Sequence, residues 1–205
     1  MTGKATERAG YHHGDLPAAL TAAAIELLDE RGMEQVTVRE VARRAGVSPG
    51  APFRHFADRQ ALLTAVADHI LADFGEWQLG VVADTGGSVM RAFGLGFVRF
   101  AIRHPRRFEL IRTRVFGDSR PAELHRRLTD IERVFTDVII ADQEAGVLRP
   151  GDPAIVGLAG QAVVYGLSQM IVDGYLPPDR AEQLAEQVLD TFGLGIANPP
   201  GRTGP

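Results

Sequence analysis

The sequence predicts an all-α protein. Apolar residues recur at spacings of three and four along most of the 205 residues, and proline and glycine interrupt these stripes. No segment alternates apolar and polar residues as a half-buried strand does. With 45% hydrophobic and 23% charged residues, the chain suits a globular protein of about nine helices, arranged as a small module joined to a larger one.

The first helix is expected to begin at Leu16 and to end at Gly32. Asp15 can accept hydrogen bonds from the free N–H groups of the first turn, and Pro17 suits that turn because an N–H is not needed there. Leucine and alanine at spacings of three and four give this helix one apolar face. Gly32 ends the helix because glycine adopts a left-handed conformation at low cost.

Two short helices follow, at residues 38–45 and 48–55, and form a helix-turn-helix signature. Thr37 and Glu40 have the spacing of a capping box, and Gly46 suits the turn between the helices. Ser48-Pro49 offers a cap and a first-turn proline for the second helix. An ordinary helical hairpin uses the same residue types. The spacing alone therefore leaves DNA binding and a structural hairpin as alternatives.

A long fourth helix is expected to begin after Asp58, which caps it, and to reach the break at Thr85-Gly86-Gly87. Proline and glycine then separate five more expected helices, at residues 88–103, 105–113, 121–145, 152–173 and 179–196. We expect two domains, residues 11–58 and 59–197, followed by a Gly/Pro-rich tail at 198–205 that is disordered.

The charge distribution favours a nucleic-acid partner more than the total charge does. The net charge of −4 at pH 7 argues against such a partner for the chain as a whole. Residues 36–59, however, contain five arginines against Glu40 and Asp58, so the acidic excess lies in the remainder of the chain. A basic segment on a helix-turn-helix is the distribution that a DNA-binding surface requires.

Three motifs in order carry a resemblance to a known family. They are YHHGDL at residues 11–16, TVREVARRAGVS at 37–48 and FRHFADRQALL at 53–63. Together they resemble the N-terminal domain of TetR-type transcriptional regulators, and the first motif resembles one subgroup. The resemblance implies a homodimer whose recognition helices enter successive major grooves of a palindromic operator in double-stranded DNA. A cytoplasmic location is expected separately, because the first ten residues lack the apolar core of a signal peptide. It further implies a repressor that is released when a small-molecule effector binds the C-terminal domain.

The residues expected to contact DNA follow partly from this resemblance and partly, for Arg39 and Arg44, from the basic charge of the segment. They are Thr37, Arg39, Arg44, Ser48, Pro49, Gly50, Ala51, Phe53, Arg54, His55 and Arg59. Two positions depart from the family pattern. Phe53 stands where the family usually has tyrosine, so a phosphate-directed hydroxyl is missing. Pro52 stands where leucine is commoner, and its missing N–H and restricted φ predict a recognition helix that is short or begins late.

Aromatic and polar residues of the C-terminal domain suggest an effector pocket. The candidate lining residues are Phe74, Trp77, Met90, Phe93, Phe97, Phe108, Phe116, Gln161 and Tyr165. An aromatic stripe of this kind is also typical of a core, so both interpretations stay open. We expect a largely apolar effector, although several arginines between residues 91 and 112 leave an acid as the alternative.

Two later apolar helices suggest a dimer interface built from four helices. The candidate interface residues are Ile155, Leu158, Ala162, Gly166, Leu184, Val188 and Phe192. No membrane partner is expected. The most apolar stretch, residues 154–172, is interrupted by glycine, glutamine and serine.

The sequence gives little support to an enzyme. It has no cysteine, and its six histidines lack the spacing of a helical metal site. We therefore expect no cofactor and no metal. His12-His13 is interpreted as part of an N-terminal arm rather than as a metal ligand pair. A helical adaptor that binds other proteins is the remaining alternative to a DNA-binding regulator.

Overall fold

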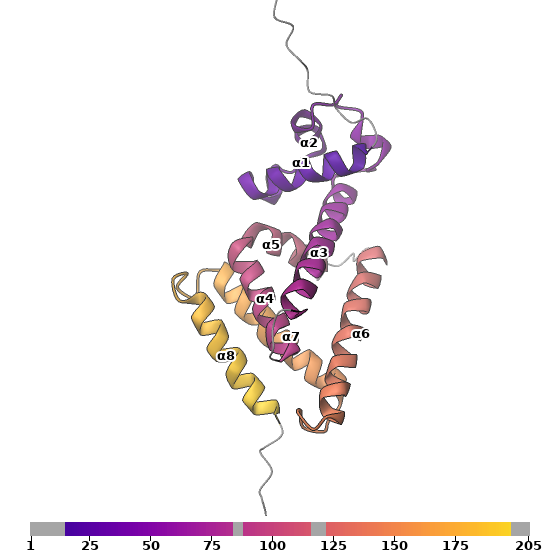
Figure 1. The fold of residues 1–205 in the computed structure, drawn as a ribbon. Coiled ribbons are helices and arrows are strands. Elements are labelled where there is room, and N and C mark those ends of the chain that lie inside the picture. The colour runs from indigo at the N-terminus through magenta and orange to yellow at the C-terminus, as the bar shows by residue number, and fades with distance from the viewer. Residues whose placement is uncertain (1–14, 84–87, 116–121, 198–205) are drawn as a thin grey trace, which may run out of the picture. The chain divides into compact units, whose positions relative to one another are not determined.

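A computed structural model describes residues 15–83, 88–115 and 122–197 of the protein. Within these ranges the chain forms eight α-helices, two short 3-10 helices and one isolated antiparallel bridge, between Leu148 and Ala197 (Figure 1). The predicted all-α class is confirmed. The YHHG part of the first motif, its candidate metal pair included, and the predicted tail lie outside the described residues.

The chain divides into two compact units, Met1–Val66 and Ala67–Pro205. The boundary falls inside helix α3 (Arg59–Ala83), eight residues beyond the position expected from the sequence. One continuous helix therefore contributes residues to both units. We describe each unit by itself.

The first unit contains α1 (Leu16–Arg31), the 3-10 helix η1 (Met33–Gln35), α2 (Val38–Arg44), the 3-10 helix η2 (Pro52–Arg54) and the start of α3. The expected caps are present, because Asp15 accepts a hydrogen bond from the Ala18 N–H at 3.1 Å and Thr37 accepts one from the Glu40 N–H at 3.2 Å. The core of this unit consists of fully buried aliphatic side chains from α1, α2 and α3, among them Leu20, Leu27, Leu28, Val41, Leu62 and Val66.

The second unit contains the remainder of α3 and five further helices (Figure 1). These are α4 (Val89–Arg103), α5 (Pro105–Val115), α6 (Ala122–Glu144), α7 (Pro153–Val172) and α8 (Ala181–Ile196). Helix α4 is central, because it packs against α5, α6, α7 and α8. Gly94 permits this close packing: a Cβ there would lie 3.1 Å from Val164 and 3.2 Å from Leu189.

A buried amide fixes how α3 meets α4 within the second unit. Gln78 is only 2% exposed, and its Nε2 donates a hydrogen bond to the Phe93 carbonyl at 3.0 Å. The amide lies directly over Gly96, where a Cβ would come within 2.8 Å of Gln78 Cδ. Glycine is therefore required at this contact, because any larger residue would displace a buried and hydrogen-bonded group.

Helix α7 is long and apolar enough to cross a membrane when judged by length and composition alone. The interruptions in the sequence predict no such segment, but the glycines and glutamines in this stretch do not offset its many aliphatic residues. Only 11% of the helix's most apolar window is buried within the chain. A single helix of this kind is also typical of a surface that another protein chain covers, and Ile155 and Leu158 on it are about three-fifths exposed.

Candidate nucleic-acid interface and effector site

The helix-turn-helix is present, but its second helix differs from the prediction. Gly46 makes the turn after α2 with a φ of 69°, and the Val47 N–H returns to the Ala42 carbonyl at 3.0 Å. Residues 48–51 then form a turn in place of the first turn of an α-helix, and Pro52–Arg54 form η2. The late start agrees with Pro52, which has no N–H to donate to an earlier carbonyl.

Most residues predicted to contact DNA are exposed in the first unit. Ser48, Pro49, Gly50, Arg54 and His55 are exposed, and so are Thr37 and Arg39 on the first turn of the motif. The ring of Phe53 is 58% exposed, which is unusual for a large apolar side chain. Ala51 is half-buried. The turn and η2 therefore present a short row of small, apolar and basic groups.

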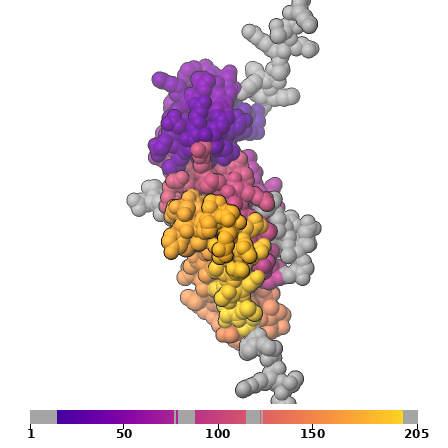
Figure 2. All heavy atoms as spheres, turned by 90° about the vertical axis from the view of Figure 1, so that its left-hand side faces the viewer, coloured from indigo at the N-terminus to yellow at the C-terminus, as the bar shows by residue number. Residues whose placement is uncertain are grey.

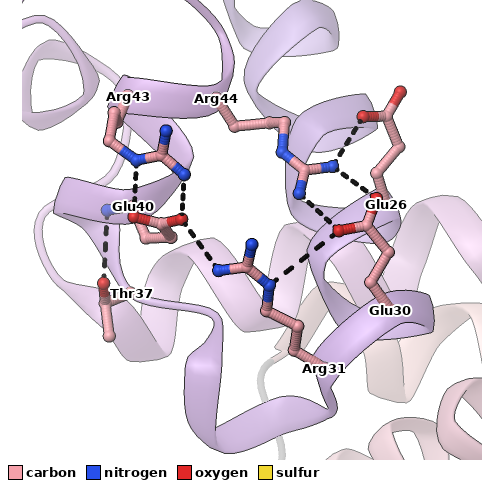
Figure 3. A network of polar contacts seen from close by, with 7 residues as sticks. All are labelled: Glu26, Glu30, Arg31, Thr37, Glu40, Arg43 and Arg44. Carbon is pink, nitrogen blue, oxygen red and sulfur yellow. Dashed lines mark hydrogen bonds and ion pairs between the residues drawn. The ribbon is translucent and has the colours of Figure 1, made fainter.

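A network of ion pairs joins α1 to α2 (Figure 3). Arg43 Nε donates to Glu40 at 2.9 Å, and Arg31 reaches the same carboxylate at 3.3 Å. Arg44 donates to Glu30 at 2.8 Å and to Glu26 at 3.2 Å. The sequence located this basic segment correctly, but acidic residues of α1 neutralise part of it.

Two of the residues predicted to contact DNA are engaged by partners within the first unit. The side chain of Arg44 is bound to Glu26 and Glu30, so its charge is compensated within the unit. Arg59 donates to the carbonyls of Val36 at 2.8 Å and Met33 at 2.6 Å, which ties the start of α3 to the segment before α2. The resemblance could not reveal these partners, because they lie 14 to 26 residues away in sequence.

Arg39 and Arg54 remain as the basic groups of the interface. Within the described part of the chain, no ion pair or hydrogen bond engages either guanidinium group. Exposed arginines of this kind bind phosphate oxygens and guanine edges in DNA. The candidate interface therefore consists of Thr37, Arg39, Arg54 and the exposed residues of the turn and η2.

The ion pairs between α1 and α2 make the first unit sensitive to acid. The hydrogen bond from Arg43 holds the pKa of Glu40 below its ordinary value of 4.5, and the bond from Arg44 lowers that of Glu30. The bonds to Glu30 and Glu26 in turn raise the pKa of Arg44. A carboxyl whose pKa is lowered by folding stabilises the folded state above its unfolded pKa, and this contribution is lost as the pH falls through the folded pKa.

We therefore expect a Glu30→Gln/Glu40→Gln variant to be less stable than the parent at pH 7, with the difference disappearing below the ordinary carboxyl range. Urea denaturation followed by circular dichroism at a series of pH values measures this difference. Glu34→Gln is the control, since this exposed carboxylate on η1 lies outside the network of Figure 3. A stability difference between the parent and the double variant that is as large at low pH as at pH 7 would contradict the expectation. Added salt should reduce the stability difference at pH 7, because it screens exposed ion pairs.

The aromatic residues of the second unit mostly pack on one another. Phe74 contacts Phe97 with ring centroids 5.7 Å apart, Phe97 contacts Phe108 at 5.9 Å, and Phe108 contacts Tyr165 at 6.1 Å. Phe93 lies against Phe135 of α6 at 4.6 Å. For these side chains the structure favours the core interpretation that the sequence left open.

The other predicted pocket residues are dispersed. Met90 is half-buried, with its methyl group 3.8 Å from a Cβ placed at Gly160. Gln161 is exposed on α7 and is not among the residues that line the hollow described below. Phe116 and the side chain of Trp77 lie outside the described residues.

A small hollow lies elsewhere in the second unit, between α3, α4 and α5. Its volume is about 170 Å³, and its lining residues are Ile70, Asp73, Phe74, Phe100, Arg103, His104 and Arg107. Only Phe74 belonged to the pocket expected from the sequence. For the other lining residues, the indication in the sequence was the group of basic residues around Pro105, where α4 ends and α5 begins.

The predicted dimer residues form exposed stretches of α7 and α8, and Figure 2 faces the side of the unit on which α8 lies. Ile155, Leu158 and Val188 are 61%, 60% and 39% exposed. Ala162 is exposed, and Gly166, Leu184 and Phe192 are half-buried. Nothing lies within 4 Å of a Cβ built at Gly166, so that glycine is not explained by packing inside the chain.

No cluster of three or more histidine, aspartate or glutamate side chains suited to a metal occurs among the residues that the structure describes.

Comparison with known protein families agrees with this geometry. The family of "Bacterial regulatory proteins, tetR family" matches residues 20–66, and the family "Tetracyclin repressor-like, C-terminal domain" matches residues 90–192. The two matches lie on either side of the boundary region in α3 and cover most of the described chain. The N-terminal subgroup suggested by the first motif lies beyond what these matches distinguish.

Individual relatives support the same assignment. The tetracycline repressor protein of class D from Escherichia coli is 32% identical over 82 residues, which is 40% of this chain and 38% of the repressor. A solved structure of a protein of unknown function from Rhodococcus sp. RHA1 is 27% identical and covers 93% of this chain and all of its own, with a TM-score of 0.82. A regulator from Pectobacterium atrosepticum, 19% identical, shares the fold over 91% of this chain and 96% of its own with a TM-score of 0.76.

Proposed function

The chain belongs to the TetR family of bacterial regulatory proteins, and on this premise we propose that it is a homodimeric transcriptional repressor. It binds a palindromic operator in double-stranded DNA and leaves the operator when a small molecule binds the second unit. The observation that carries the proposal is the exposed turn and η2 segment, which presents Phe53, Arg54 and His55 next to a helix-turn-helix. Access to DNA places the protein in the cytoplasm.

Each part of the candidate interface has a chemical role in this proposal. Thr37 Oγ1 accepts the Glu40 N–H, which leaves the hydroxyl hydrogen available to donate to a phosphate. Arg39 and Arg54 supply the charge that attracts the DNA backbone. Gly50 and Ala51 permit close approach to the major groove, and the Phe53 ring suits an apolar contact with a thymine methyl group.

We expect Arg54→Ala to weaken operator binding about tenfold and to reduce the slope of log K against log salt by about one, because one phosphate or base contact is removed. Fluorescence anisotropy with labelled operator at several salt concentrations measures both quantities. Arg180→Ala is the matched control, since Arg180 is an exposed arginine of the second unit at the start of α8. An unchanged affinity and slope would show that this surface does not face DNA.

The dimer is proposed to form through the exposed apolar residues of α7 and α8. Ile155, Leu158, Ala162 and Gly166 are spaced so that they lie on one side of α7, and that side is not covered within the chain. Two such helices from each protomer would form a four-helix interface. The interface also accounts for the apolar composition of α7 without a membrane.

Control by an effector requires that the ligand bind the two states of the dimer with different affinity. Helix α3 is suited to carry this control, because it holds Arg59 in the first unit and Ile70 and Phe74 in the second. Recognition helices of such a dimer lie about one helical turn of DNA apart, roughly 34–36 Å, so a small change in spacing prevents both half-sites from being bound together.

Selection of bound sequences from a random DNA pool tests the proposed function as a whole. A palindrome with two half-sites is the expected result, and it would report DNA binding, symmetry and half-site spacing in one experiment. Recovery of no sequence, together with flat salt dependence of any retention on DNA, would favour a protein-binding adaptor instead.

A further inference from the structure

We propose that the hollow between α3, α4 and α5 binds a small monocarboxylic acid with a compact apolar body, about the size of benzoate. This inference rests on the proposed function, because it names the chemical class of the effector. It selects the acid that the arginines between residues 91 and 112 left as the alternative to a largely apolar effector.

The inner wall of the hollow is apolar and of limited size. Ile70 is 1% exposed, and Phe74 and Phe100 lie against each other with ring centroids 4.8 Å apart. A volume of about 170 Å³ is close to that of a cavity of about 150 Å³ that holds benzene in another protein. The space therefore suits one aromatic ring or a short branched chain.

The rim of the hollow carries positive charge. Arg103 is the last residue of α4, and Arg107 lies in the first turn of α5 after the break at His104-Pro105. That first turn contains no acidic residue, so no carboxylate of its own offsets the positive end of the α5 dipole. A ligand oxygen at the rim would meet a guanidinium group and the N-terminal end of a helix together.

Arg103 differs from the preceding arginines of α4 in having its charge uncommitted. Arg91 is paired with Asp190, and Arg99 is paired with Glu182 and Glu186 of α8. Among the residues that the structure describes, no partner engages the Arg103 side chain. An external anion is the natural partner for a cationic group placed beside an apolar hollow.

Asp73 limits the ligand to a single negative charge. Its carboxylate lines the same hollow and lies 3.5 Å from Nε2 of His69. The uncommitted guanidinium group of Arg103 offers one positive charge to a ligand at the rim. A second negative charge on the ligand would be repelled by Asp73, which disfavours phosphate esters and dicarboxylates.

The test compares benzoate with benzyl alcohol, which has a similar shape but no charge. Isothermal titration calorimetry on the full chain is expected to show one benzoate site per protomer and binding of benzyl alcohol that is at least about tenfold weaker. Arg103→Gln should weaken benzoate binding by about tenfold or more and leave benzyl alcohol unaffected. Arg180→Gln, an exposed arginine away from the hollow, is the control and should bind like the parent.

No benzoate binding, equal binding of acid and alcohol, or equal losses in Arg103→Gln and Arg180→Gln would each overturn the inference. Circular dichroism of both variants separates a lost site from a lost fold. A parallel titration with selected operator DNA separates the inference from the proposed function. If the protein binds the operator but does not bind benzoate, only the proposed ligand class is refuted. If it binds benzoate but binds no DNA, only the proposed regulatory function is refuted.

Discussion

A Leu158→Glu variant is expected to be monomeric and to bind the palindromic operator at least about 100-fold more weakly than the parent, a loss of roughly 3 kcal/mol. Leu158 is 60% exposed on the uncovered side of α7, one turn after Ile155. In the proposed dimer a carboxylate at this position would be buried without a partner, which costs several kcal/mol. A monomer would then bind one half-site at a time and lose the contribution of the second.

Sedimentation equilibrium and operator titration measure the two effects separately. Val134→Glu is the matched control, because Val134 is also a large exposed apolar residue, 49% exposed, but lies on α6. It should remain dimeric and bind operator like the parent. A parent that is already monomeric, or a Leu158→Glu variant that still dimerises, would show that α7 is not the interface.

The second large effect is expected at Arg59. Replacing it by methionine keeps the aliphatic stem but removes the donors to the Val36 and Met33 carbonyls, so that two charge-assisted hydrogen bonds are lost. Each such bond contributes about 1.5–3 kcal/mol, and Val36 is fully buried. We therefore expect the free energy of unfolding of the first unit to fall by about 3 kcal/mol.

Urea denaturation gives the change in stability, and hydrogen exchange of the segment around Val36 assigns it to the first unit. Arg39→Met is the control, since this exposed arginine on α2 should lose almost no stability when its charge is removed. If Arg59→Met kept the parental stability but bound operator weakly, the guanidinium group would be a DNA contact, as the family resemblance implied.

Local signals were sufficient to predict the helices. Asp15 and Thr37 cap helices where the sequence placed caps, and Gly32 and Gly46 have the positive φ values that end helices. The effect of Pro52 was also predicted in direction, since the second helix of the motif begins late and is of 3-10 type. These features depend on residues within about four positions of one another, so they can be predicted from the local sequence.

The functional role of individual side chains was less predictable. Arg44 and Arg59 belong to the same basic segment as Arg54, and their residue type does not distinguish them. Glu30 lies 14 residues before Arg44, and Met33 lies 26 residues before Arg59. Only the packing of α1 beside α2 and α3 determines which arginines are compensated.

The sequence by itself therefore determined the all-α class, most helix boundaries, the helix-turn-helix and the family. Tertiary structure alone decided which arginines are paired within the first unit, which aromatic residues pack on one another, and where a hollow remains. The physical reason is the separation along the chain over which each interaction acts. Capping, periodicity and turns act over one or two helical turns, whereas ion pairs and cavities depend on side chains that only the folded chain brings together.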